Sequence, residues 1–245
     1  MGGLARQAAD YVQGSRRAIP SHDERDEERN ARAHAERKHL YDWAEDNDRL
    51  IEADLKTDKG GGEHAVLFRP EKLLVLKDTH PDVGFGGGFA LNNKNAATVG
   101  EYLDRITLAN QEFGSAITLV GIRRTGVGPS IRTQMPFFKG DPAMQGEIDS
   151  AMENAGYEII GEAAYFNPGK NIVVYDLFPK NAVILDGHLH PIDPIIQRVN
   201  PEFVPELKNL YFAIAQGLAV NFQKPLSNDS NHPTDEKNSS RTDGG

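Results

Sequence analysis

The sequence predicts an α+β fold, and three observations lead to this prediction. Short apolar runs, rich in Val, Ile and Leu, have the length and composition of β-strands. Turns that contain glycine or proline separate several of these runs by only a few residues, which favours antiparallel pairing between neighbours. Longer segments with apolar residues at helical spacing lie between the strand groups and carry cap residues at their ends.

The composition is that of a globular protein without a broad basic surface. The 245 residues are 38% hydrophobic, which is enough to build a core in one or two domains. With 27 basic and 36 acidic residues the formal net charge is −9, so we expect no nucleic-acid partner and no attraction to anionic lipid. The absence of cysteines excludes disulfides, thiolate zinc sites and cysteine nucleophiles.

The sequence carries no recognisable signal for a membrane or for export. Its apolar runs are all shorter than the roughly 18 residues of a membrane-spanning helix. Residues 1–17 contain three arginines but not the apolar core of a secretory signal. We therefore expect a cytoplasmic protein, and delivery into another cell by a system that reads unstructured termini stays open.

The first 58 residues are expected to form a flexible terminus followed by a charged helical arm. Residues 1–20 lack a clear pattern and are predicted to be flexible. Residues 21–58 mix charges of both signs, and Leu40, Trp43 and Leu50 supply a sparse apolar face at helical spacing. This pattern predicts a charged helical arm that docks mainly by its second half, as an interaction arm or as a solvated scaffold helix.

Residues 59–136 are expected to form a five-stranded antiparallel sheet. Pro70 and the 126–129 segment each mark a turn between two apolar runs, and a short strand before Gly60 would complete the sheet. The other expected strands lie at 64–68, 73–76, 117–123 and 130–136.

One helix is expected between the second and third of these longer strands. Thr98 and Glu101 have the spacing of a capping box, which is typical of a helix start. Gly114 is suited to end the helix after about residue 113.

Residues 137–225 are expected to form a second, smaller part of the molecule. Helices are predicted over 145–155 and 205–222, and the dipeptide Asp186-Gly187 predicts a hairpin turn. The polar residues 226–245 are expected to be disordered. The expected strands of this part lie at 172–175, 182–185 and 189–192.

Three polar residues near these strands have a spacing suited to phosphoryl transfer. Asp176 directly follows the strand at 172–175, Asn181 comes five residues later, and Asp193 follows the next hairpin. Because that hairpin folds the chain back, Asn181 and Asp193 should lie side by side. An aspartate can orient an acceptor hydroxyl, while an amide and a carboxylate together suit Mg²⁺ on nucleotide phosphates. Singly each residue would be read as a turn cap or a solvated group, and their order favours a site.

A cation and a glycine cluster earlier in the chain fit the same chemistry. Lys77 ends an apolar strand, which would hold its backbone while the ammonium reaches into a cleft. Gly60, Gly61 and Gly62 would let backbone N–H groups approach a phosphate, and a plain hairpin turn explains them equally well.

Seven segments occur in the order found in a known family: GGEHAV (61–66), LK (76–77), EYLDR (101–105), NQEFG (110–114), PFFKG (136–140), YDLFPKN (175–181) and PID (191–193). The chain resembles the protein-kinase-like domains of bacterial polyvalent proteins, which occur in phages and conjugative elements. The resemblance covers about residues 60–196. It implies a two-lobed protein-kinase-like fold, with a five-stranded antiparallel N-lobe, a reduced helical C-lobe and ATP in the cleft between them.

The resemblance also implies roles for individual residues. Asp176 would be the catalytic aspartate, Lys77 would contact the ATP phosphates, and Asn181 and Asp193 would bind Mg²⁺. The implied reaction is transfer of a phosphoryl group to a Ser, Thr or Tyr hydroxyl, with a protein as the expected acceptor.

Glu101 would be the ion-pair partner of Lys77 and so part of the nucleotide site, together with Gly60, Gly61 and Gly62. The capping box explains Glu101 without any such role, and Glu112 lies on the same predicted helix. The partner of Lys77 is therefore left open between Glu101 and Glu112.

The chain departs from the general kinase pattern at several positions. Val174-Tyr175 stands where His-Arg usually precedes the catalytic aspartate, and Pro194-Ile195 follows Asp193 in place of Phe-Gly. Phe178 replaces the usual phosphate-contacting lysine, with Lys180 as the nearby basic residue.

Three other functions stay open at the level of sequence. A nucleotide-binding pseudokinase would fit the missing lysine, and a small-molecule kinase of the aminoglycoside type shares the Asp176 to Asn181 spacing. A metal-dependent hydrolase would instead use His188 and His190, which should share one strand face, with Asp186 or Asp193 completing the site.

Overall fold

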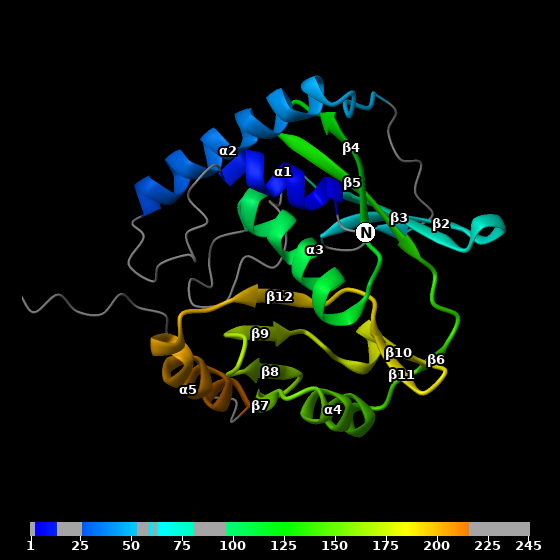
Figure 1. Cartoon of the computed structure of the whole chain (residues 1–245), viewed down its shortest axis with the longest axis vertical. Coiled ribbons are helices and arrows are strands. Elements are labelled where there is room, and N and C mark those ends of the chain that lie inside the picture. The colour runs from blue at the N-terminus through cyan, green and yellow to red at the C-terminus, as the bar shows by residue number, and fades with distance from the viewer. Residues whose placement is uncertain (1–2, 14–25, 53–58, 61–62, 81–96, 216–245) are drawn as a thin grey trace, which may run out of the picture.

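The computed structural model describes residues 3–13, 26–52, 59–60, 63–80 and 97–215. In this part of the chain, antiparallel sheets and helices make up a mixed fold (Figure 1). The predicted tail at 226–245, the end of the last predicted helix, Gly61 and Gly62 lie outside the described residues.

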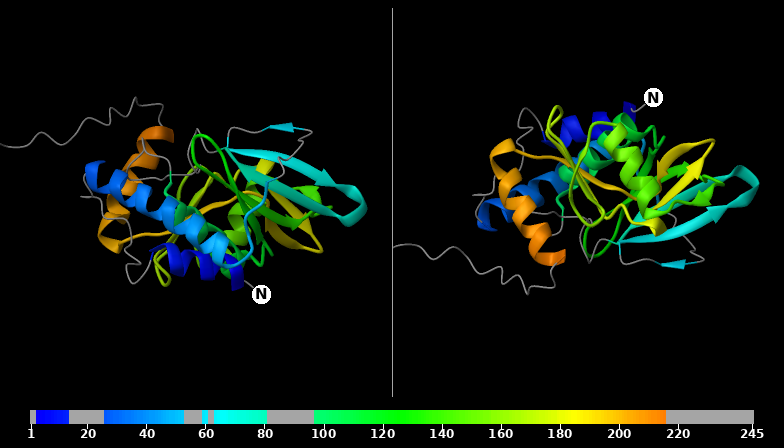
Figure 2. Two further views of the ribbon diagram at one scale, coloured as in Figure 1. Left: turned by 90° about the horizontal axis from the view of Figure 1, so that it is seen from above. Right: turned by 90° about the horizontal axis from the view of Figure 1, so that it is seen from below.

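The first sheet has five antiparallel strands in the order β1-β2-β3-β5-β4. Its β2–β3 hairpin turns through the short helix Pro70–Lys72 and extends past the neighbouring elements at one end of the molecule (Figure 2). The strands are β1 (Lys59–Gly60), β2 (His64–Arg69), β3 (Leu74–Thr79), β4 (Thr118–Arg124) and β5 (Pro129–Pro136).

Helix α3 (Val99–Phe113) begins and ends where the sequence predicts. The Thr98 side chain accepts a hydrogen bond from the backbone of Glu101, and the Glu101 carboxylate accepts one from the backbone of Thr98, which completes a capping box. Gly114 ends the helix in the left-handed conformation, with φ of 61°. The helix is thus specified at both ends by local signals.

The prediction of a flexible N-terminus over 1–20 is wrong for residues 3–13. These residues form helix α1 (Gly3–Gln13), in which Ala5, Ala8, Ala9 and Val12 are buried against α2 and α3 (Figure 1). Their spacing is helical, but alanine offers little apolar area and so gives a weak signal of burial. The small side chains allow the α1 and α3 backbones to approach closely. Which face of α1 is buried is therefore evident only from its packing against the neighbouring helices.

Helix α2 (Asp26–Asp46) is the predicted charged arm, and its second half packs into the core through Leu40, Trp43 and Ala44. Residues 49–51 continue from it along the sheet edge, where Leu50 forms a bridge with Ile122 of β4. None of the described helices is both long and apolar enough to cross a membrane.

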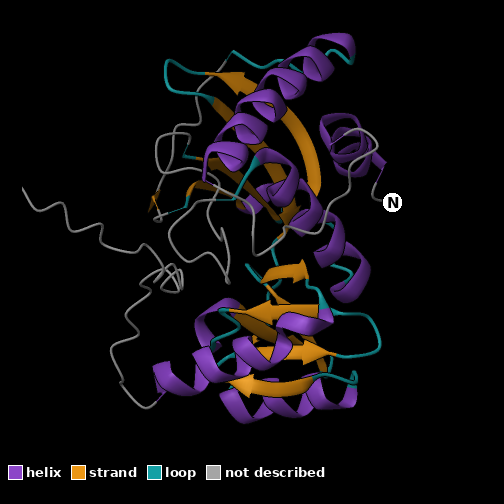
Figure 3. Ribbon diagram, turned by 90° about the vertical axis from the view of Figure 1, so that its left-hand side faces the viewer, coloured by secondary structure: helices purple, strands orange, loops and turns teal. Residues whose placement is uncertain are grey.

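The second part of the molecule contains more strand than the predicted reduced helical C-lobe (Figure 3). Its sheets have the orders β11-β10-β6 and β12-β9-β8-β7. The short runs 158–161 and 164–167 were not expected as strands, because a four-residue run offers little periodicity to detect. The elements are β6 (Asp141–Pro142), α4 (Gln145–Asn154), β7 (Glu158–Gly161), β8 (Ala164–Asn167), β9 (Ile172–Tyr175), β10 (Ala182–Leu185), β11 (His188–Pro191), β12 (Ile195–Arg198) and α5 (Val204–Ala215).

Helix α3 packs against both parts of the molecule. Its first half, including Leu103 and Ile106, joins α1, α2 and the five-stranded sheet in one core. Leu108 and Ala109 join a second core with residues of β8, β9 and β12. A shift of α3 would therefore disturb packing on both sides of the molecule.

A charge placed on the buried face of α1 tests whether the N-terminus is folded. Ala8→Asp should lower the free energy of unfolding by more than about 2 kcal/mol, because Ala8 is fully buried and a carboxylate would lose its hydration. Gln7→Asp adds the same charge to the exposed face of α1 and should change it by less than about 0.5 kcal/mol. Urea unfolding of both variants measures the difference, and equal stabilities would contradict the docked helix.

Candidate active site

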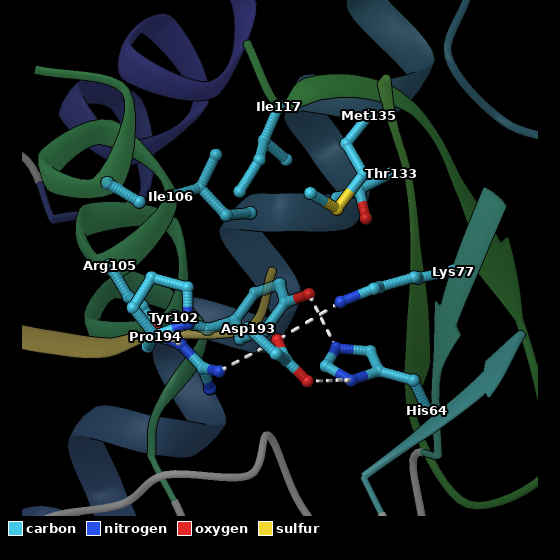
Figure 4. A pocket seen from close by; sticks show the side chains of 11 residues that line it. His64, Lys77, Tyr102, Arg105, Ile106, Ile117, Thr133, Met135, Asp193 and Pro194 are labelled. Carbon is cyan, nitrogen blue, oxygen red and sulfur yellow. Dashed lines mark hydrogen bonds and ion pairs between the residues drawn. The ribbon is translucent and has the colours of Figure 1, made fainter. Parts of the chain in front are cut away.

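A small pocket lies where the five-stranded sheet, α3 and the segment before β12 meet. One wall is apolar and contains Ile106, Ile117 and Met135, while the opposite side carries charged and polar groups (Figure 4). The charged and polar residues that line it are His64, Lys77, Tyr102, Arg105, Thr133 and Asp193.

Lys77 lies on β3 between two neighbouring strands, and its ammonium contacts the segment before β12. Nζ lies 3.2 Å from Oδ1 of Asp193 and donates a hydrogen bond to the Ile192 carbonyl at 3.3 Å. The side chain is buried because β3 is an inner strand, paired at Lys77 with Val66 and Thr133. The predicted lysine and the predicted metal-binding aspartate thus lie in direct contact.

Arg105, which the sequence analysis did not single out, is the second cation on Asp193. Its Nη2 lies 3.1 Å from Asp193 Oδ1, its Nη1 lies 2.6 Å from Glu63 Oε1, and its Nε donates to the Pro194 carbonyl at 2.9 Å. The signal that could have identified it is an arginine on the buried face of α3, one turn after Tyr102 and next to Ile106.

Asp176 and Asn181 form a closed loop after β9. Asp176 adopts a left-handed conformation with φ of 51°, which aspartate tolerates better than most residues. Asn181 Nδ2 donates to the Asp176 carbonyl at 2.7 Å and to Asp176 Oδ2 at 2.8 Å. Because Nδ2 of the side-chain amide faces Asp176, the side-chain oxygen Oδ1 of Asn181 is turned away from Asp176.

Strand pairing brings this loop next to Asp193. Asn181 accepts a hydrogen bond at its carbonyl from the backbone of Ile192 at 2.8 Å, and Tyr175 pairs with Ile195 across β9 and β12. Asp176 directly follows β9 and Asp193 lies just before β12, so both residues lie at the same end of this strand pair. The pocket described above is lined by Lys77 and Asp193 but not by Asp176 or Asn181.

A family model described as Serine/Threonine/Tyrosine Kinase found in polyvalent proteins matches residues 33–200. The chain belongs to this kinase family. It is therefore a phosphotransferase by family. Comparison with curated proteins and with solved structures found no match.

In this kinase, Glu101 is not the partner of Lys77. Its carboxylate pairs with Arg29 at 2.8 Å and with Arg32 at 3.0 Å, both from α2, while it caps α3. The capping interpretation of Glu101 is confirmed, and the two arginines explain why the carboxylate points away from the pocket. Glu112 is engaged elsewhere, with the Tyr157 hydroxyl and Lys170.

The remaining residues of the predicted nucleotide site lie apart from Lys77 or outside the described residues. Gly60 pairs with Ala65 in the short strand β1, so the described part of the glycine cluster belongs to a hairpin. Gly61 and Gly62 are not described. Lys180, the nearest basic residue to Phe178 in sequence, places its ammonium 5.7 Å from the Phe178 ring centre.

The two histidines of the hydrolase alternative do not join a carboxylate cluster among the described residues. His188 is exposed, and His190 stacks on Phe138 with ring centres 4.6 Å apart. The described groups close enough to share a cation are instead Glu63, His64 and Asp193. Two cations contact this cluster: Lys77 lies against Asp193, and Arg105 lies against both Glu63 and Asp193.

The charges of the pocket depend on one another. Burial alone would raise the pKa of Asp193, but Lys77 and Arg105 outweigh it and lower the pKa to about 2. Burial raises the pKa of Glu63, against the opposing effect of Arg105. Burial would lower the pKa of Arg105, yet Glu63 and Asp193 raise it overall. Asp193 is therefore ionised at physiological pH.

His64 lies inside the same cluster and is neutral. Its Nε2 lies 2.9 Å from the Tyr102 hydroxyl, and burial lowers its pKa to about 3, with Lys77 and Arg105 acting in the same direction and Asp193 in the opposite one. His80 also lowers this pKa.

The Glu101 ion pairs should contribute measurably to stability. Glu101→Gln removes the charge that Arg29 and Arg32 share while leaving an amide that can still cap α3. We expect a loss of about 1–3 kcal/mol and, in a double-mutant cycle with Arg29→Gln, a coupling energy of about 1 kcal/mol or more, since Arg29 is buried. Denaturant unfolding supplies the values, and a coupling near zero would show that the pair is not formed in solution.

Acid should destabilise the folded protein through His64. Because folding lowers the pKa of His64 from 6.5 to about 3, the unfolded chain binds the proton more tightly, and stability falls as the pH decreases below 6.5. The slope from this group approaches about 1.4 kcal/mol per pH unit. Thermal unfolding between about pH 7 and 5 should show a shallower decline for His64→Gln than for the wild type.

The exposed His188 provides the matched control, since His188→Gln should leave the pH dependence unchanged. A His64→Gln profile parallel to that of the wild type would mean that folding does not lower the pKa of His64.

Proposed function

We propose that this chain is an ATP- and Mg²⁺-dependent protein kinase of a minimal, two-lobed type. The observation that carries the proposal is the contact of Lys77 with Asp193 beside the Asp176–Asn181 loop, in a chain whose family is a Ser/Thr/Tyr kinase. The family description supports a hydroxyl acceptor on protein, and the lack of cysteines fits a reducing cytoplasm.

The donors at Asn181 and Asp193 fit Mg²⁺. Asp193 offers an ionised carboxylate, and the hydrogen bonds of Asn181 Nδ2 to Asp176 leave an amide oxygen for a cation. Hard oxygen donors of this kind, few in number, are those that Mg²⁺ uses beside phosphates. The ion would neutralise charge on the phosphates and on the developing transition state.

Asp176 is suited to orient the acceptor. Asn181 Nδ2 holds one carboxylate oxygen, Oδ2, which restricts rotation of the side chain. The other oxygen, Oδ1, can accept a hydrogen bond from an acceptor hydroxyl. This contact would direct a lone pair of the hydroxyl oxygen toward the phosphoryl group. The short helix Pro179–Asn181 supports this arrangement from the backbone.

Lys77 would change partners when nucleotide binds. The pocket beside it encloses about 20 Å³, room for about one water, which is far less than a purine needs. Nucleotide must therefore displace side chains or lie beyond this pocket, and phosphate oxygens would compete with Asp193 for the Lys77 ammonium.

Replacing the catalytic aspartate should abolish transfer without unfolding the protein. Asp176→Asn keeps a residue that tolerates the left-handed backbone, so we expect a loss of about 10²–10⁴-fold in ATP-dependent phosphorylation of a generic protein substrate. Asp186→Asn is the matched control, since Asp186 is exposed and has a similar φ of 52°. It should keep full activity in a γ-phosphate transfer assay.

The same assay separates the alternatives. Equal signals from the wild type and Asp176→Asn would contradict catalysis by Asp176, and nucleotide binding without transfer would indicate a pseudokinase. Phosphorylation of aminoglycosides but not of protein would assign the chain to small-molecule kinases.

A further inference from the structure

We propose that Arg105 is the positioning residue of the metal-binding carboxylate: it holds Asp193 in place while Lys77 leaves Asp193 for the nucleotide. This inference rests on the proposed function and adds a residue with no assigned part in it. Three features support it: the contacts of Arg105, the partial exposure of Asp193, and the pairing of Glu101 with α2 and not with Lys77.

Arg105 binds two consecutive residues with one rigid group. The guanidinium donates from Nε to the Pro194 carbonyl at 2.9 Å and from Nη2 to Asp193 Oδ1 at 3.1 Å. Since these donors lie in one plane at fixed spacing, the backbone after Asp193 and its carboxylate are oriented together. Lysine has a single flexible ammonium and could not impose this geometry.

Asp193 needs such support because its side chain is only partly buried. Its side chain is 36% exposed, whereas those of Arg105 and Lys77 are 9% and 11% exposed. Both cations contact the same oxygen, Oδ1. Oδ2 lies 4.0 Å from His64 Nδ1, which is too long for a hydrogen bond, so Oδ2 is the oxygen that would be left for Mg²⁺.

The arrangement of α3 explains why an arginine has this task. Glu101 is held by Arg29 and Arg32, so α3 presents no carboxylate to Lys77, and Lys77 pairs with Asp193 instead. When phosphates attract Lys77, Asp193 would lose one of its two cations. Arg105 stays, because Glu63 at 2.6 Å also holds it.

The ion pair of Arg105 with Glu63 determines which variants can be compared. Removing Arg105 alone would leave Glu63 buried without its cation and could unfold the protein. The double variant Glu63→Gln/Arg105→Met removes both charges and keeps a similar side-chain length. Glu63→Gln alone retains the Arg105 contact with Asp193 and serves as the matched control.

The experiment measures Mg²⁺ binding by the full chain with ADP present. Mg²⁺ is titrated at fixed ADP, and the shift in unfolding temperature gives the apparent Mg²⁺ affinity. We expect the double variant to bind Mg²⁺ about 10–100-fold more weakly than Glu63→Gln, since groups that orient metal ligands have effects of this size. ADP binding without metal should change much less. Equal Mg²⁺ affinities in the two variants would overturn the proposal.

Arg105→Lys is the second variant, in case the double variant does not fold. It keeps the charge beside Glu63 and Asp193, so the protein should fold, but it cannot hold Asp193 and Pro194 together. Its Mg²⁺ affinity should fall about tenfold or more below that of the wild type. A wild-type affinity in Arg105→Lys would show that charge alone suffices and would overturn the positioning role.

The wild type separates this inference from the proposed function. Mg²⁺-dependent ADP binding without phosphoryl transfer would overturn the catalytic proposal, and the comparison of Arg105 variants would still decide the inference. No Mg²⁺-dependent ADP binding by the wild type would overturn both, because Asp193 would then not be a metal ligand.

Discussion

The buried guanidinium of Arg105 is the constraint to which the rest of the site adapts. A charge removed from water is tolerated only when partners surround it, and Arg105 finds them in Glu63, Asp193 and the Pro194 carbonyl. Glu63 directly precedes β2 of the five-stranded sheet, and Asp193 and Pro194 lie in the link between β11 and β12. One arginine on α3 therefore connects both parts of the molecule at Asp193, the proposed metal ligand.

The N-terminal helices control the same region from the other end of α3. Arg29 and Arg32 of α2 hold Glu101, one turn before Arg105, and α1 packs along α3. In the usual kinase arrangement the acid on this helix would pair with the strand lysine. Here that acid belongs to the α2 contact, so Lys77 turns to Asp193. The charged arm is therefore part of the electrostatics of the site as well as of its scaffold.

Turns and helix ends were predicted correctly where they depend on interactions between residues close in the sequence. The α3 capping box, the β2–β3 turn at Pro70 and the Asp186-Gly187 hairpin all depend on neighbouring residues and are present. Helix α1 was missed because the burial of its alanines depends on packing against other helices, which the sequence of α1 alone does not show. Arg105 was missed for a related reason, since an arginine in a helix is usually solvated and its partners lie about 40 residues before and 90 residues after it.

The two halves of the proposed site differ in what holds them. Asp176 and Asn181 are fixed by hydrogen bonds within one short loop, which are independent of pocket charge. Asp193 is held by ion pairs with two cations, one of which phosphate can attract away. Nucleotide binding should therefore leave the Asp176 loop unchanged and redistribute charge only around Asp193. In the proposed function the Asp176 loop is preorganised while Asp193 exchanges partners, so nucleotide binding would be coupled to the position of α3 through Asp193 and Arg105.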